Sequence, residues 1–149
     1  MAGVYFTCQP GEITTGTAAK TLLQIIAPTN QRLLLEHIWI DFKGIVGTDA
    51  PILVDILIQT TAGTMISLTP QKWNANDDET LQVTAQHTAT AEPTAGAVKM
   101  SREVHPQAGF DWGYPGNPRP LVIPGGTRLG IRVTAGVTTS AVPGVLGHE

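Results

Sequence analysis

Apolar and polar residues alternate along several short segments of this chain. Between residues 52 and 61, Asp55 and Gln59 occupy one face, and the opposite face carries the branched apolar residues Ile52, Val54, Ile56 and Ile58. Residues 127–135 alternate in the same way. A period of two places successive side chains on opposite faces of a β-strand. We therefore expect two half-buried strands here, with Asp55 and Gln59 facing outward.

The longest alternating segment covers residues 33–43. The positions expected to face the core are Leu34, Ile38, Ile40 and Phe42, and Glu36 is the exception on that face. The opposite face would carry His37, Trp39, Asp41 and Lys43. A strand of this length with one apolar face is typical of an antiparallel sheet that packs on a single core.

Ten such segments can be placed, at residues 4–8, 20–27, 33–43, 52–61, 64–69, 81–88, 98–105, 121–123, 127–135 and 141–146. Eleven prolines and 16 glycines are spread between them, which leaves no room for a long helix. Threonine, a β-branched residue that favours strands, occurs 20 times against three serines. The prediction is an all-β fold, an antiparallel β-sandwich of jelly-roll type with about eight to ten short strands, as one domain over residues 1–149.

Composition narrows the function classes. Charged residues make up 14% of the 149 residues, and the net charge is −3, whereas an average soluble domain has about 25% charged residues. A nucleic-acid partner is not expected, because the basic clusters that would displace counterions are missing. No apolar run approaches the roughly 20 residues of a membrane helix, so no membrane partner is expected. The single Cys8 cannot form an intrachain disulfide.

The low charge is concentrated in two segments. Residues 56–71 and 133–148 contain no Asp, Glu, Lys or Arg, and protein interfaces are depleted of charge at their centres. Pro143 predicts that residues 141–146 form an edge strand, because proline cannot donate to a central ladder. Residues 136–149 form either a loose tail or a C-terminal arm that docks on a neighbouring subunit. The arm is the favoured interpretation, with candidate contacts at Val137, Val142, Val145 and Leu146.

An aromatic segment follows residue 109. Phe110, Trp112 and Tyr114 lie within five residues of a predicted loop, and tyrosine and tryptophan are enriched at interface hot spots. These three residues and Trp73 are therefore candidate contacts for a partner or a carbohydrate. The alternative is that the aromatic side chains fold back and plug one end of the sandwich.

Catalytic and metal-binding signals are weak. Glu103 and His105 lie two residues apart, which would fit a cupin-like metal enzyme, but a pattern of paired histidines and a following glutamate is missing. Cys8 lies on an apolar segment, which favours a buried and inert thiol over a nucleophile. We expect no catalytic residues, no metal site and no cofactor.

Five segments, residues 20–25, 57–64, 84–93, 103–107 and 124–132, resemble those of small bacteriophage structural proteins. The likeness extends over most of residues 15–135 and is strongest to capsid decoration, or cement, proteins. It implies a non-enzymatic component on the capsid exterior of the virion, assembled in the host cytoplasm. The implied partners are further copies of the chain, as a homotrimer, and the major capsid protein.

A second interpretation stays open. A jelly-roll module associated with a phage tail or fibre could bind host carbohydrate, or another virion protein, through Trp73, Trp112 and Tyr114. The chemistry of the aromatic segment supports this alternative, whereas the low charge and the resemblance support the decoration protein.

Overall fold

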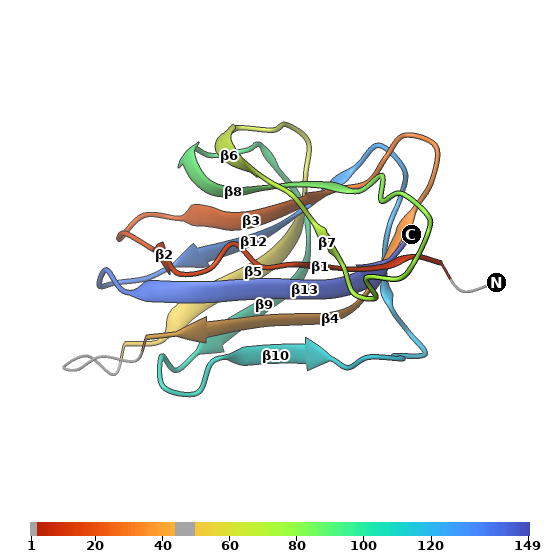
Figure 1. Ribbon diagram of the computed structural model, residues 1–149. Helices are drawn as coiled ribbons and strands as arrows, with labels where there is room; N and C mark the ends of the chain where they lie inside the picture. Colours follow the sequence, from red (N-terminus) through yellow and green to blue (C-terminus); the bar gives the residue numbers. More distant parts are fainter. Residues whose placement is uncertain (1–2, 44–49) are drawn as a thin grey trace.

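The computed structural model describes residues 3–43 and 50–149, and all regular secondary structure in this part of the chain is β-strand. The strands form two antiparallel sheets that lie one above the other (Figure 1). The lower layer in that view is the seven-stranded sheet, here called sheet A, and the upper layer is the six-stranded sheet, here called sheet B. The expected all-β fold with two antiparallel sheets is confirmed.

Sheet A has the order β10 (Phe110–Gly113), β4 (Leu33–Phe42), β13 (Ser140–His148), β1 (Tyr5–Cys8) and β7 (Gln71–Lys72), with β11 (Leu121–Ile123) on β4 and β2 (Ile13–Thr14) on β13. Sheet B has the order β6 (Thr64–Leu68), β8 (Thr84–Ala91), β3 (Lys20–Ile26), β12 (Arg128–Thr134), β5 (Ile52–Gln59) and β9 (Ala95–Val104). Each of the ten expected segments contains a strand. β10 was expected to be part of a loop.

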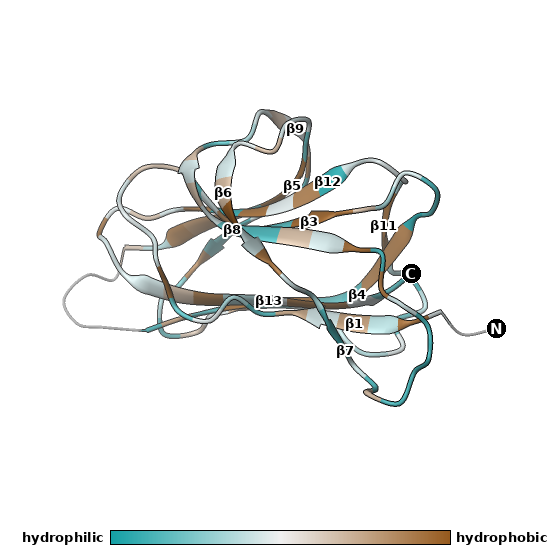
Figure 2. Cartoon of the chain, turned by 45° about the horizontal axis from the view of Figure 1, so that its top comes forward, coloured by the Kyte–Doolittle hydropathy of each residue, from teal (hydrophilic) through white to brown (hydrophobic). Residues whose placement is uncertain are grey.

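The core fills the space between the two sheets. Hydrophobic positions concentrate in the strands of both layers, while the connections are mostly pale or teal (Figure 2). The largest fully buried side chains come from both layers: Phe6, Leu22, Leu23, Ile25, Leu33, Leu35, Ile38, Ile40, Ile56, Leu57, Ile123 and Leu129. Cys8 also lies in the core, and burial raises the pKa of its thiol to about 12. The thiolate needed for nucleophilic chemistry is therefore scarce at neutral pH.

Strand β4 departs from a strict alternation at Glu36. Its register against β13 slips there, because Leu146 pairs with His37 and Gly147 pairs with Leu35. The slip inserts one extra residue, so the inward face changes from odd to even positions along the strand. Leu33 and Leu35 are buried on one side of the bulge and Ile38 and Ile40 on the other. The expected inward position of Leu34 was therefore wrong, and the exceptional Glu36 marks the bulge.

Strand β13 lies in the middle of sheet A, between β4 and β1. The expected edge strand and docking arm were therefore wrong over Ser140–His148. Pro143 is tolerated because β2 pairs only with residues 140 and 141 and β1 only with residues 145–148, so Pro143 falls between the two partners. Val145 points into the core and is fully buried, and Leu146 is 4% exposed. Neither residue is available to a neighbouring subunit.

Part of the outer face of sheet B, around Gln59, is covered by the chain itself. The side chain of Gln59 lies over Gly130, where a Cβ atom would come within 2.4 Å of the Gln59 amide. The Gln59 amide oxygen accepts a hydrogen bond of 2.8 Å from the Gln24 amide. The connections that follow β5 and β8 pass over these side chains, and the Thr61 carbonyl accepts a second bond from Gln24. Gln59 and Asp55 are 2% and 7% exposed. The expectation that both face solvent was therefore wrong.

Candidate interaction surface

The outer face of sheet A gathers most of the aromatic side chains that reach the surface. The strand register places Tyr5 beside His148, Leu146 beside His37, and Trp39 between Gly144 and Asp111. Trp73 continues this face beyond β7, because its backbone N–H donates to the Tyr5 carbonyl. We call this surface the aromatic face and define it by Tyr5, His37, Trp39, Trp73, Tyr114 and His148.

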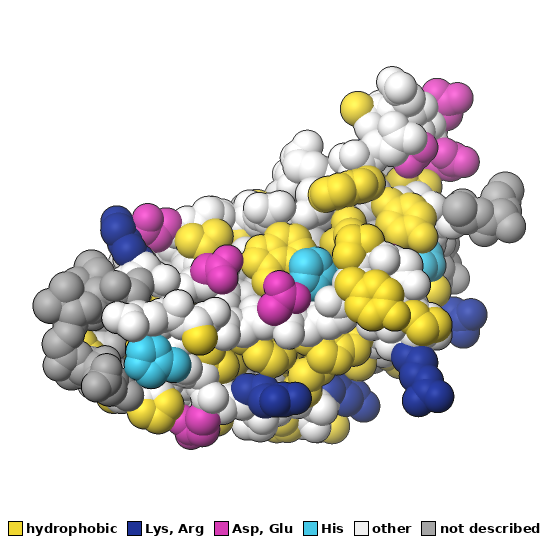
Figure 3. Space-filling model, turned by 90° about the horizontal axis from the view of Figure 1, so that it is seen from below, with side chains coloured by type: hydrophobic (Ala, Val, Ile, Leu, Met, Phe, Trp, Pro, Cys, Tyr) yellow, Lys and Arg dark blue, Asp and Glu magenta, His cyan; other side chains and the backbone are white. Residues whose placement is uncertain are grey.

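Figure 3 views the molecule from the side of the aromatic face. Hydrophobic side chains gather in its middle and towards one end, with histidine and acidic side chains between them. Trp73 and Tyr114 are 62% and 57% exposed. Tyr114 joins the face at its margin, where its backbone N–H donates to the carbonyl of Glu36 on β4. Flat aromatic groups and hydrogen-bonding groups therefore alternate across one side of the sheet.

Trp39 lies across the backbone of the neighbouring strand. A Cβ atom on Gly144 would come within 2.2–2.6 Å of three indole atoms, Cζ2, Cε2 and Nε1. Only glycine leaves room for the indole to rest on the sheet at this point. One face of the ring is therefore held against β13, and the orientation of the side chain is set by packing.

We expect Gly144→Ala to displace Trp39 and to lower the free energy of unfolding by about 1–3 kcal/mol, since the added methyl group overpacks this contact. Urea titration followed by circular dichroism measures the loss, and the tryptophan emission spectrum of the folded protein reports the displacement. Gly136→Ala is the matched control, because a Cβ atom there meets nothing within 4 Å. Equal behaviour of the two variants would contradict the packing described for Trp39.

A histidine and a carboxylate lie beside the indole. The rings of His37 and Trp39 are 4.9 Å apart at 45°, and His37 Nε2 lies 2.6 Å from Asp111 Oδ1. The side chain of Asp111 is 68% exposed and that of His37 is 22% exposed. This pair places polar groups that can donate and accept hydrogen bonds at the edge of the Trp39 ring.

A buried carboxylate supports the other end of the aromatic face. Glu36 accepts hydrogen bonds from the Tyr5 hydroxyl at 3.3 Å and from the Gly116 backbone N–H at 2.7 Å. His148 Nδ1 lies 3.2 Å from the carboxylate but is not aligned for a hydrogen bond. The His148 ring packs on the Tyr5 ring at a centroid distance of 4.8 Å. Partial burial and then the neighbouring Glu36 carboxylate raise the pKa of Tyr5 above its ordinary value.

Some of the residues expected from the sequence to form an interface are exposed in the structure, and the others are buried or half-buried. Trp73, Tyr114 and Val137 are exposed, Val137 at 50%. Phe110 and Trp112 pack against the core, because they pair with Ile40 and Ile38 and share their inward face. Val142 is half-buried opposite Asp41, and Val145 and Leu146 are buried. The alternative in which part of the aromatic segment closes the sandwich therefore holds for Phe110 and Trp112.

Sequence reasoning did not select Tyr5, His37 and Trp39 as contact residues. The available signal was the outward position of His37 and Trp39 in the alternation of residues 33–43. The contribution of Tyr5 could not be inferred from that segment, because β1 and β4 are joined only through β13.

Two exposed edges lie on sheet B. Among the described residues, strand β6 pairs only with β8. It carries no charged residue and exposes Ile66 at 55%. Strand β9 pairs only with β5, and its uncharged first residues Ala95–Val98 are exposed. Natural monomers usually protect such edges with charge, proline or a covering segment. The edge at β6 has neither charge nor proline.

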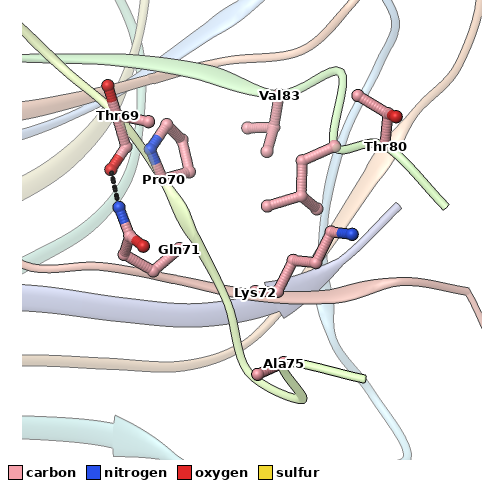
Figure 4. A pocket seen from close by; sticks show the side chains of 8 residues that line it. Thr69, Pro70, Gln71, Lys72, Ala75, Thr80 and Val83 are labelled. Atoms are coloured by element: carbon pink, nitrogen blue, oxygen red, sulfur yellow. Dashed lines mark hydrogen bonds between the residues drawn. The ribbon is translucent and has the colours of Figure 1, made fainter. Parts of the chain in front are cut away.

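Two open hollows on the described part of the surface hold few groups suited to catalysis. One of about 450 Å³ lies beside β7 and is lined by residues that include Pro70, Lys72 and Val83 (Figure 4). Lys72 Nζ donates to the Asp77 carbonyl at 2.6 Å. A second hollow of about 330 Å³ is lined in part by Glu103, His105 and Trp112. Within residues 3–43 and 50–149, no cluster of three or more His, Cys, Asp or Glu side chains could hold a metal ion.

Comparison with known protein families, with characterised proteins and with solved structures gives no match. The described part of the chain also contains no helix long and apolar enough to cross a membrane. The fold and the surface described above are therefore the basis for a functional assignment.

Proposed function

We propose that this chain is a non-enzymatic structural protein of a bacteriophage virion that decorates and stabilises the exterior of the capsid. It would act as a homotrimer bound to the major capsid protein. The observation that carries the proposal is the uncharged, exposed edge of sheet B at β6. An edge of this kind is a liability in a monomer and is protected when another chain covers it.

The two charge-free segments of the sequence support the proposal differently. Residues 133–134 and 140–148 fall in β12 and β13, at the centres of the two sheets, so burial within the chain explains their lack of charge, whereas the connection between these strands is exposed at residues 136–138. Residues 56–71 begin in buried β5 and continue through β6, where Ile66 is exposed, to the first residue of β7. Burial within the chain therefore does not explain the lack of charge on β6, whereas burial against another subunit does.

We also propose that the sandwich is a jelly roll. The order β1-β13-β4-β10 in one sheet and β3-β12-β5-β9 in the other supports this topology. Strands β1, β3, β4 and β5 fall alternately in sheets A and B, as expected when a long antiparallel ribbon wraps around a core. Strands β6 and β8 then form an insertion between β5 and β9 that extends sheet B beyond β3.

Decoration would stabilise a capsid by many repeated contacts. Each contact that removes apolar surface from water contributes about 25 cal/mol per Å². Contacts made by several linked subunits strengthen one another, because the second contact is made at high effective concentration. A modest contact at each edge is therefore sufficient when it is repeated over a closed shell.

We expect the protein to be a trimer by size-exclusion chromatography with light scattering, and Ile66→Lys to dissociate it, because a lysine would bring charge into the covered edge. Val122→Lys is the matched control, since Val122 is 42% exposed on β11 of the other sheet. Cosedimentation with shells assembled from the major capsid protein of the same genome tests the proposed contact between this chain and the capsid. A protein that stays monomeric and does not sediment with these shells would refute the proposal.

A further inference from the structure

We infer that the aromatic face of sheet A binds neutral carbohydrate, with Trp39 and the His37–Asp111 pair at the centre of the site. This inference goes beyond the decoration role and does not depend on it. It also differs from the carbohydrate site suggested by the sequence, because Trp112 points into the core and Trp39 replaces it.

The first argument is the placement of Trp39. Gly144 allows the indole to lie across β13, so its position is fixed before any ligand arrives. The face of an aromatic ring carries partial negative charge and attracts the partly positive C–H groups of a sugar ring. A ring already held in place by packing binds without first losing conformational freedom.

The second argument is the polar pair beside the ring. Asp111 is mostly exposed and its Oδ1 is held by His37 at 2.6 Å. A carboxylate can accept hydrogen bonds at both oxygens, so Asp111 can accept from sugar hydroxyl groups while it remains paired with His37. Sites that combine an aromatic surface with a few placed polar groups are typical for small polar ligands.

The third argument is charge, which favours a neutral sugar over a protein or an acidic glycan. Asp111 and the exposed Asp41 lie on this face, and Lys and Arg side chains appear towards the margins of the view in Figure 3. A protein interface depletes charge at its centre, and an anionic sugar would be repelled by two carboxylates. The hydroxyl groups of a neutral sugar can donate hydrogen bonds to Asp111 and Asp41. They neither bury these charges in a protein interface nor repel them.

The extent of the face indicates an oligosaccharide. Tyr5 on β1 and Trp39 on β4 lie on either side of β13, where they pair with His148 and Gly144, respectively. They are therefore two strands apart and offset by four residues along the strand direction. Standard strand spacing and rise place the two backbones roughly 16 Å apart. A single sugar cannot contact both aromatic residues, whereas a chain of several sugar units can. We therefore expect longer oligosaccharides to bind more tightly than monosaccharides.

The test is a titration of the full chain with cellohexaose, chitohexaose and maltohexaose, followed by the indole N–H resonances of the three tryptophans. We expect at least one of these sugars to shift the Trp39 resonance and leave that of Trp112 unchanged. A hyaluronan hexasaccharide, which is anionic, should produce a shift at least tenfold weaker at equal concentration. Hexalysine serves as a probe for a basic protein segment.

Three variants separate binding from folding. Trp39→Ala should weaken binding of the active hexasaccharide at least tenfold, and Asp111→Asn about fivefold with an unchanged circular dichroism spectrum. Asp77→Asn, in the loop after β7, should bind as the original chain does. The inference is wrong if none of the three neutral sugars shifts the Trp39 resonance, if hexalysine shifts it at lower concentration than they do, or if Asp111→Asn and Asp77→Asn bind equally.

Discussion

Asp55→Ala is expected to lower the free energy of unfolding by about 3 kcal/mol. The Asp55 carboxylate is paired with Arg132 Nη2 at 3.0 Å and accepts a hydrogen bond of 2.6 Å from the Ser101 hydroxyl. Removing one partner of a buried pair leaves the other charge uncompensated, which typically costs about 3–5 kcal/mol. We expect the lower end of this range, because the Arg132 side chain retains 23% exposure and some contact with water.

Urea denaturation followed by circular dichroism measures this loss. Glu12→Ala is the matched control, because the Glu12–Lys43 pair spans a similar distance but its side chains are 51% and 62% exposed. Exposed pairs contribute little, so the control should show no measurable change. Ser101→Ala should remove about 1 kcal/mol, the contribution of one hydrogen bond. If Asp55→Ala and Glu12→Ala are equally stable, the buried pair between β5 and β12 does not stabilise the fold.

Glu36→Ala is expected to cost about 3 kcal/mol and to loosen one end of the aromatic face. The substitution leaves the Gly116 N–H and the Tyr5 hydroxyl without their carboxylate acceptor, and hydrogen bonds to charged groups contribute about 1.5–3 kcal/mol each. Glu36→Gln keeps an acceptor oxygen at the same place and should lose less. Urea titration of the two variants separates the removal of the charge from the removal of the side chain.

An alkaline titration of tyrosine absorbance provides a second readout. The raised pKa of Tyr5 means that its hydroxyl keeps its proton longer in the folded than in the unfolded state. The corresponding stability is fully present below the ordinary tyrosine pKa of 10.0 and is lost as the pH rises through the folded value. In Glu36→Ala the pKa of Tyr5 should fall but remain above 10.0, because the larger cause is burial. An unchanged titration would show that Glu36 does not act on Tyr5.

The alternation of side chains was sufficient to locate most of the strands. Ile52, Val54 and Ile56 are buried as expected, because a period-two pattern follows directly from strand geometry. Leu34 was assigned to the wrong face because a bulge changes the phase of an alternation, and a single sequence does not show where the partner strand slips. The charged Glu36 inside an apolar segment was the local sign of that slip.

Long-range placement explains the remaining differences. Asp55 and Gln59 occupy outward positions of β5, as the pattern indicates, but Gln59 lies under a connection, and Asp55 is paired with Arg132 and Ser101 from the neighbouring strands. Pro143 indicated an edge strand. It is tolerated in a central strand because β2 pairs with β13 before Pro143 and β1 pairs with β13 after it, so neither strand pairs with Pro143 itself. For the aromatic face, the sequence provided Trp73 and Tyr114 but not their association with Tyr5 and Trp39, which depends on strand order.

The central positions of β12 and β13 constrain how this chain can be made. Strands β3 and β5 are joined through β12, and β1 and β4 through β13. During synthesis, the earlier strands therefore leave the ribosome long before the strands that connect them. Pairings between segments more than a hundred residues apart form slowly, because a large loop must close first. The nascent chain will hold unpaired apolar strands until residue 148 has emerged, so its yield in a cell should depend on chaperones during translation.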